Sequence, residues 1–288
     1  MGDLIERPIE QPIEQPIKQP IERPHCIISG SKMKQFLACP THLYAHPDDL
    51  VDDRPKTAAQ EGERAHDLAE RCFWDGEAAF KGCRNKRMME GARLYAQTLL
   101  ALSEGVKENV RTEQFVTMGE HFGFFDSQFV GGYYDAMVID ESRKLLHCAD
   151  YKFGFHVVEP TTPQLTFYIL ALILQRARER YGVMPIWEEE IVAHIREHYG
   201  DWHFGQTIVQ PKREEPVNTW EPTVDDICDF VRAFCRATMV YQDAGRFDDA
   251  TCHTNGYCKY CAKARICAQS AMREDEACAF TFDKEDVK

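Results

Sequence analysis

The chain has 288 residues, a formal net charge of −13, 44% hydrophobic residues and 28% charged residues. These proportions are typical of a soluble globular protein with a full core, and no apolar run is long enough to cross a membrane. The negative charge excludes a generally basic nucleic-acid coat protein, but it does not exclude an enzyme that holds phosphates through bound metal ions. Because the N-terminus is acidic and proline-rich rather than basic and apolar, we expect a cytoplasmic protein.

The two ends of the chain differ in composition from the middle. Residues 5–24 are five tandem tetrapeptides that each begin with isoleucine and end with proline. A proline at every fourth position disfavours helix and sheet and favours extended polyproline II. Residues 274–288 contain six acidic and two basic residues. We therefore predict a disordered arm at 1–24, a folded domain at 25–273 and a flexible acidic tail at 274–288.

The hydrophobic pattern of the folded domain predicts groups of helices and strands. In chain order, we expect a short helix that runs through Leu37 and stops at Cys39, then helices over 58–74 and 85–102, and strands over 110–118, 130–139 and 145–153. A helix over 164–181, strands over 191–198 and 207–209, and a helix over 223–243 follow. Pro163 suits the first turn of the third long helix. This order predicts an α/β fold in which a mixed central β-sheet is flanked by helices.

The strands at 130–139 and 145–153 are expected to pair as a hairpin around a polar turn. This hairpin carries Asp135, Asp150 and Lys152. A carboxylate buried in a strand is costly unless it is paired or binds a metal. Asp150 and Lys152 are two positions apart and share a strand face, so a simple ion pair is one interpretation. The other is a divalent cation held by carboxylates beside a lysine that assists a reacting water.

Four features of the sequence line up in chain order. They are His66, Asp135, the motif Asp150-x-Lys152 and the motif Gln164-x-x-x-Tyr168. Together they resemble the PD-(D/E)XK nuclease superfamily over residues 29–267. The similarity is greatest to the RecB-like branch, which includes phage-type exonucleases and CRISPR-associated iron–sulfur nucleases. It implies a restriction-endonuclease-like core and makes 25–273 a nuclease domain.

The resemblance also implies a role for each matching residue. The implied ligands of Mg²⁺ or Mn²⁺ are His66, Asp135, Asp150 and the backbone carbonyl of Tyr151. Lys152 orients or deprotonates the attacking water, and we favour an orienting role because neighbouring carboxylates keep an ammonium group protonated. Gln164 and Tyr168 steady the site and contact the DNA backbone. Glu61 and Glu113 are weaker candidates for further metal groups, and a histidine ligand shifts the preference modestly toward Mn²⁺.

Twelve cysteines in a chain expected to be cytoplasmic are better explained as metal ligands and buried thiols than as disulfides. Cys258, Cys261 and Cys267 lie within ten residues of one another and need a fourth partner to bind a metal. If Cys252 completes the set, the local spacing indicates structural Zn²⁺. The resemblance implies instead that Cys39, from before the nuclease core, completes a [4Fe–4S] cluster, and we prefer this assignment.

The substrate expected from the resemblance is DNA, either single-stranded or at the ends of a duplex. Basic residues that could lie near the groove are Lys81, Arg84, Lys86 and Arg87, together with the run Arg176, Arg178 and Arg180. The run is better explained as a solvated helix end, where cations are favoured. Aromatic residues that could stack on unpaired bases are Phe73, Trp74, Tyr133 and Tyr134. No DNA-reading helix motif is present, which indicates an exonuclease that acts on DNA structure in recombination, repair or replication. The chain also lacks a helicase phosphate loop, so a helicase, annealing or replication partner would be a separate protein.

Three other functions are alternatives at this point, and one of them, a zinc-knuckle nucleic-acid module without catalysis, leaves the charged hairpin unexplained. A catalytically silent DNA-binding or scaffold protein could keep the same fold, although the intact Asp135, Asp150 and Lys152 argue against it. A structure-specific endonuclease could use the same catalytic residues, and cleavage of closed circular DNA would favour it.

Overall fold

The computed structural model describes residues 26–44, 56–123 and 130–244, together with Cys252, Cys258, Cys261 and Cys267. The predicted arm at 1–24 and the predicted tail at 274–288 lie outside the described residues. Five strands form one sheet in sequence order, namely β1 (Val110–Thr117), β2 (Gly131–Asp140), β3 (Leu145–Tyr151), β4 (His203–Val209) and β5 (Val217–Trp220). All neighbouring strands are antiparallel except β3 and β4, which are parallel.

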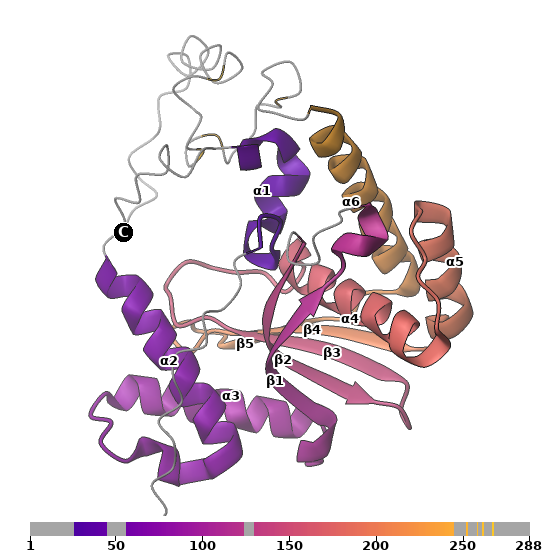
Figure 1. The fold of residues 1–288 in the computed structure, drawn as a ribbon. Coiled ribbons are helices and arrows are strands. Elements are labelled where there is room, and N and C mark those ends of the chain that lie inside the picture. The colour runs from indigo at the N-terminus through magenta and orange to yellow at the C-terminus, as the bar shows by residue number, and fades with distance from the viewer. Residues whose placement is uncertain are drawn as a thin grey trace, which may run out of the picture.

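Helices cover both faces of this mixed sheet (Figure 1). One face packs against α2 (Lys56–Asp75) and α3 (Lys86–Leu102), and the other against α1 (Met33–Ala38), α4 (Pro163–Tyr181), α5 (Glu188–Tyr199) and α6 (Val224–Ala244). None of the described helices is both long and apolar enough to cross a membrane. The predicted α/β architecture with a mixed central sheet is therefore confirmed.

Successive residues of β3 face opposite sides of the sheet and pack against different helices, as strand geometry requires. Ala149 and Tyr151 pack with α2 and α3, whereas Leu146 and Cys148 pack beneath α4. Because β3 is the central strand and is buried on both faces, any charged group on it must be paired within the protein. The carboxylate of Asp150 lies on this strand and therefore needs a positive charge or hydrogen-bond donors from neighbouring residues.

The long helices and the central hairpin begin and end close to their predicted residues. Asn85 caps α3 by accepting a hydrogen bond from the Met88 amide at 3.1 Å, and Pro163 opens α4 as predicted. The hairpin between β2 and β3 turns at residues 141–144, where Lys144 has a left-handed φ of 49°. Local capping and turn residues therefore carry enough information to position these elements.

The strand predicted over 191–198 is wrong, because these residues belong to α5. Its buried residues Ile191, His194, Ile195 and Tyr199 recur at helical rather than alternate spacing. The Glu190 carboxylate also accepts a hydrogen bond from the Ile186 amide at 2.9 Å, ahead of the first turn. Glutamates at the start and basic residues at the end of α5 match the helix dipole.

Two further differences concern the strands that follow. The strand β4 begins at His203, four residues before the predicted start, and β5 was not predicted. The side chains of β5 are mostly exposed at the sheet edge, so the sequence there shows no buried alternation. An edge strand of this kind is defined by its pairing with β4, which is a non-local interaction.

The carboxylate of Asp140 organises the end of the hairpin and gives a test of fold stability. It accepts hydrogen bonds from the Ser142 hydroxyl at 2.6 Å and from Arg143 Nε at 2.8 Å. These interactions, the Ser142 bond foremost, lower the pKa of Asp140 to about 2. A carboxyl group whose pKa is lowered by folding stabilises the protein above its unfolded pKa, and this stabilisation is lost as the pH falls.

We therefore expect Asp140→Asn to lower the free energy of unfolding at neutral pH by about 1 to 2 kcal/mol, after allowance for solvent screening. The difference between the two proteins should shrink between about pH 4 and about pH 2, where the wild-type carboxylate takes up its proton. Urea denaturation of both proteins across this range would measure it. A difference that stays constant with pH would show that the charge of Asp140 contributes nothing.

Candidate active site

The candidate site lies where β2 and β3 run side by side. Ala136 of β2 pairs with Ala149 of β3, so Asp135 and Asp150 occupy neighbouring positions of the antiparallel pair. The Asp135 carboxylate accepts a hydrogen bond from the Tyr151 amide at 2.8 Å. These contacts bring the two predicted carboxylates into one site.

The helix α2 contributes His66 to this site. Its Nδ1 lies 3.1 Å from Oδ2 of Asp135, and its ring meets the Tyr151 ring edge-on with centroids 5.4 Å apart. Tyr151 in turn packs against Tyr95 of α3 at 5.2 Å. The aromatic packing fixes the imidazole against the sheet, so that one of its nitrogen atoms is held beside the Asp135 carboxylate.

Lys152 and Gln164 both bind the second carboxylate. The Lys152 ammonium lies 2.8 Å and 2.7 Å from the two oxygen atoms of Asp150. Gln164, in the first turn of α4, donates a hydrogen bond to Oδ1 of Asp150 at 3.2 Å. Asp150 is only 2% exposed, so the Lys152 charge supplies the pairing that a buried carboxylate requires. Both hydrogen bonds go to Oδ1, and in the described contacts Oδ2 has no hydrogen-bond partner.

Glu113 of β1 completes a group that could hold a metal ion. One ligand atom from each of His66, Glu113 and Asp135 lies within 4.8 Å of the other two. The pairing of Thr112 with Ala136 and of Gln114 with Tyr134 places Glu113 across from Asp135. Carboxylates that face each other across two strands repel, and a cation between them would remove that repulsion. An oxygen-rich set with one imidazole fits Mg²⁺ or Mn²⁺.

The backbone at Glu113 supports this interpretation. Its φ is 49°, in the left-handed region that residues with side chains rarely adopt. Such conformations cost free energy and are concentrated at functional sites. The residue was only a weak candidate in the sequence, because neither its backbone conformation nor its neighbour in β2 can be inferred from local sequence.

The electrostatic environment separates the two aspartates. Burial raises the pKa of Asp150 to about 6, against the opposing charge of Lys152. Burial also acts to raise the pKa of Asp135, but the charges of His66 and Lys152 outweigh it and the pKa of Asp135 is lowered. Asp135 is therefore more fully ionised than Asp150 at neutral pH.

The pKa values of the two basic groups, Lys152 and His66, are both raised. Burial lowers the pKa of Lys152, but the attraction of Asp150 and Asp135 exceeds this effect and leaves the pKa raised. The same competition, with Asp135 as the main partner, leaves the pKa of His66 raised. Lys152 is thus held as an ammonium ion, in agreement with the orienting role expected from the sequence.

Tyr168 supports the site from beneath. It lies one turn after Gln164 on α4 and is only 4% exposed. Burial raises the pKa of its hydroxyl, and a hydrogen bond with Gln164 opposes this only in part. Of the two roles implied for this residue, steadying the site agrees with its burial, whereas contact with the DNA backbone stays a prediction.

Glycines explain how Tyr168 reaches this position. A side chain at Gly30 would place its Cβ 2.5 Å from the Tyr168 ring, and one at Gly132 would come within 3.2 Å of the Tyr168 hydroxyl. A Cβ at Gly131 would lie 2.4 Å from the Val116 carbonyl oxygen of β1. The two glycines that precede Asp135 by three and four residues therefore allow close packing on both sides of β2.

Several residues expected near the DNA lie elsewhere. Phe73 and Tyr134 are each 1% exposed, so they are core residues and the prediction that they could stack on bases is wrong. Lys81, Arg84, Lys86 and Arg87 are exposed around the start of α3. The arginines 176, 178 and 180 pair with glutamates 120 and 141. Glu141 begins the hairpin turn, so this end of α4 lies away from Gln164 and the interpretation that places the run near the groove is wrong.

Of the remaining candidates, Glu61 is not part of the group that could hold a metal ion among the described residues. It is on α2, five residues before His66, and lies 3.4 Å from the Lys212 ammonium. Tyr133 packs on Phe115 with ring centroids 5.2 Å apart. Sequence reasoning did not single out Lys212, because it follows β4 and is distant in sequence from every motif.

The described contacts do not support the preferred [4Fe–4S] assignment on Cys39, Cys258, Cys261 and Cys267. The Thr41 hydroxyl lies 3.8 Å from Cys39 Sγ and 3.3 Å from Cys252 Sγ. Burial raises the pKa of Cys252 to about 12, and the neighbouring thiols Cys39 and Cys267 act in the same direction. In the described part of the chain, the cysteine sulfurs form no group as close as that of the metal site on the sheet. Cys39 thus approaches Cys252, which the preferred assignment had left out.

The fold and the site together define a class of protein. The central strand carries a buried Asp-x-Lys motif beside a histidine and two further carboxylates. This arrangement is the one expected of a metal-dependent nuclease. A family model described as the PD-(D/E)XK nuclease superfamily matches residues 27–268. The chain belongs to this superfamily. No curated protein and no solved structure matched the chain.

Proposed function

We propose that this nuclease is a DNA exonuclease of the RecB-like branch that hydrolyses phosphodiester bonds at DNA ends. The observation that carries the proposal is the convergence of His66, Glu113 and Asp135 beside the Asp150–Lys152 ion pair. The family supplies the nuclease class, and the helix histidine supports the RecB-like assignment. Recombination, repair or replication of phage type is the setting implied by the resemblance.

The residues of the site have different roles, and the first of these is to bind the metal ion. His66, Glu113 and Asp135 would hold the divalent cation, and Asp150 with the Tyr151 carbonyl remains a further predicted contributor. When bound, the cation neutralises charge on the phosphoryl oxygens and activates a water molecule. Mn²⁺ is expected to support activity at least as well as Mg²⁺, because imidazole ligands favour the later metal.

Lys152 provides the second positive charge of the reaction. Its raised pKa keeps it protonated, so it can donate hydrogen bonds to the attacking water or to the phosphate and stabilise the developing negative charge. Asp150 and Gln164 hold the ammonium group in place. Because the carboxylate of Asp150 is fixed by two donors, the lysine cannot turn away from the site without leaving a buried charge unpaired.

Cleavage of end-labelled DNA tests this proposal. Linear single-stranded and double-stranded DNA should be degraded progressively from an end with Mg²⁺ or Mn²⁺, and closed circular DNA should resist. Cutting of closed circles would favour the endonuclease alternative. A folded protein that binds DNA and metal but cuts neither form would favour the silent scaffold alternative.

We also propose that the cysteines bind a cofactor, either a [4Fe–4S] cluster on Cys39, Cys258, Cys261 and Cys267 or structural Zn²⁺ with Cys252. The proximity of Cys252 to Cys39 and Cys267 supports a ligand set that includes Cys252. Metal analysis of anaerobically purified protein separates the two: iron and a brown colour indicate the cluster, and stoichiometric zinc indicates the alternative. Cys252→Ser should lower the metal content, whereas Cys235→Ser on α6 should not.

A further inference from the structure

The loop that joins β3 to α4 carries an exposed aromatic side chain next to the site. Phe155 follows Lys152 by three residues and is 64% exposed. A large apolar side chain in this position gains little from folding, because most of its surface stays in water. Single exposed phenylalanines are common on protein surfaces, so the argument depends on how the ring is held and what surrounds it.

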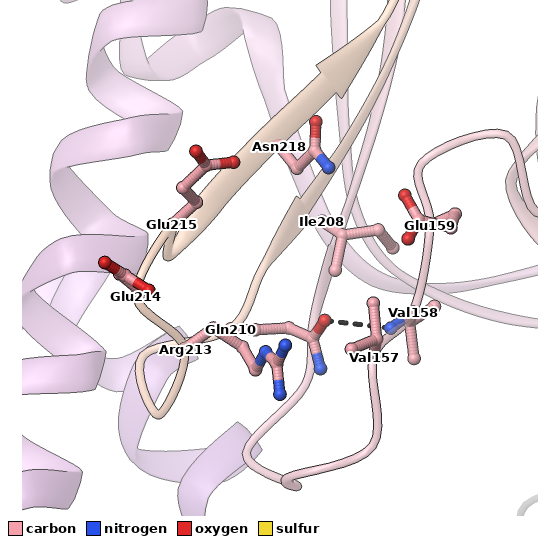
Figure 2. Close-up of a pocket in the computed structure, with 9 residues that line it drawn as sticks. All are labelled: Val157, Val158, Glu159, Ile208, Gln210, Arg213, Glu214, Glu215 and Asn218. Carbon is pink, nitrogen blue, oxygen red and sulfur yellow. Dashed lines mark hydrogen bonds between the residues drawn. The ribbon is translucent and has the colours of Figure 1, made fainter. Parts of the chain in front are cut away.

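The backbone that follows Phe155 is held by a buried glutamine that comes directly after β4. Gln210 is 4% exposed; its Oε1 accepts from the Val158 amide at 2.9 Å (Figure 2), and its Nε2 donates to the His156 carbonyl at 2.8 Å. Arg213 also donates to the Phe155 carbonyl at 3.3 Å. Three hydrogen bonds from one short segment fix the loop, so the phenyl ring is presented to solvent on an ordered backbone.

A lysine lies beside this ring and connects it to the active-site helix. The Lys212 ammonium is 4.8 Å from the Phe155 ring centroid and 3.9 Å from that of Phe153. It also lies 3.4 Å from Glu61 of α2. Phe153 in turn stacks on Tyr151 with ring centroids 6.3 Å apart, and Tyr151 contacts the His66 ring. A chain of ring contacts therefore connects the ammonium group to the metal site.

The surface on the other side of the loop carries mainly acidic charged groups, which disfavour DNA binding. A pocket of about 270 Å³ lies between the loop and the β4–β5 hairpin (Figure 2). Its charged lining consists of the carboxylates of Glu159, Glu214 and Glu215 and one cation, Arg213, so that the net charge of the lining is negative and repels phosphate. A nucleic-acid strand that leaves the active site along this loop would therefore follow the surface of Phe155 and Lys212 rather than the pocket.

We propose that Phe155 is a stacking platform for a base of an unpaired strand, with Lys212 packed against the ring to hold it in place. This inference rests on the proposed nuclease function and names its substrate class as single-stranded DNA ends. An exposed aromatic ring next to a cation is the device by which proteins bind single strands without reading sequence. The base faces of a duplex are already stacked on one another, so the platform discriminates in favour of unpaired DNA.

Three full-length variants test the platform. Phe155→Ala removes the ring, Phe155→Trp keeps an aromatic surface, and Trp187→Ala removes a ring that is 67% exposed at the start of α5. On single-stranded DNA, Phe155→Ala should raise KM about tenfold with little change in kcat, which corresponds to the loss of one stacked base. Phe155→Trp should restore KM, and Trp187→Ala should leave it unchanged.

A binding measurement without cleavage separates this inference from the proposed function. In a Lys152→Ala background, 2-aminopurine near the end of a single strand should be quenched when Phe155 or tryptophan is present and not when alanine replaces it. A strand with abasic positions should bind the parent protein as weakly as the intact strand binds the Phe155→Ala form.

The outcomes distinguish the two ideas. Cleavage that proceeds in Phe155→Ala with unchanged KM, or abasic DNA that binds as well as intact DNA, would overturn the platform while leaving the nuclease function in place. Quenching that depends on Phe155, combined with no cleavage by the protein in which Lys152 is intact, would support the platform and refute the nuclease proposal.

Discussion

Replacement of Lys152 by alanine is expected to reduce DNA cleavage by at least about a hundredfold with either Mg²⁺ or Mn²⁺. The reason is that the variant loses the only ammonium group that the described contacts place on Asp150. The measurement is single-turnover cleavage of end-labelled linear DNA at saturating protein, so that binding and chemistry are separated.

This substitution should leave the fold intact. Asp150 is buried and has a pKa of about 6 even with Lys152 present, so loss of the lysine raises its pKa further. A neutral carboxyl group can keep its hydrogen bond to Gln164, and protonation avoids the large penalty of an unpaired buried charge. Thermal denaturation of both proteins would show whether the loss of activity is independent of unfolding.

A matched control is available at the other end of the same strand. Lys144 precedes β3, is half exposed and pairs with Asp201. Lys144→Ala should therefore retain full cleavage activity, since exposed ion pairs contribute little. Undiminished cleavage by Lys152→Ala would remove Lys152 from the mechanism and leave the metal site alone to explain the reaction.

Sequence reasoning located the centre of this site because its signals are local. Asp150 and Lys152 are two positions apart on one strand, and Gln164 and Tyr168 are one turn apart on one helix. Strand and helix periodicity determine such relationships directly. The fold class followed in the same way from the order of the helices and strands.

The parts that sequence reasoning missed or ranked low depend on distant contacts. Glu113 matters because the β1–β2 register places it across from Asp135 and its φ is 49°. Lys212 meets Phe155 only because the parallel pairing of β3 with β4 brings the following loops together. The strand predicted over 191–198 failed for a different reason, since a short apolar pattern fits both periods and the choice depends on packing.

Asp135→Asn is expected to abolish metal binding while preserving the apo structure. Wild-type protein should gain about 2.7 kcal/mol of stability at a Mn²⁺ concentration one hundred times the Kd. The variant should gain almost none, because it loses the carboxylate charge from the group formed with His66 and Glu113. Cleavage should fall about a thousandfold, in line with the several kcal/mol that a catalytic metal contributes.

The apo forms of the two proteins should differ little in stability. Asparagine has nearly the same shape as aspartate, and its carbonyl oxygen can still accept the hydrogen bond from the Tyr151 amide. The substitution also removes repulsion from Glu113 across the strands, which offsets the lost attraction to His66. Thermal denaturation without metal would confirm this, and the same experiment with Mn²⁺ would show the missing stabilisation.

Dependence on pH gives this prediction a second readout. Asp135 raises the pKa of His66, and the imidazole must lose its proton before it can bind a metal ion. Mn²⁺ affinity of the wild-type protein should therefore weaken as the pH falls through the raised pKa of His66. Asp201→Asn, at an exposed carboxylate that pairs with Lys144, should behave as wild type in every assay. Retention of the Mn²⁺-dependent stabilisation by Asp135→Asn would place the metal away from Asp135 and refute the assigned site.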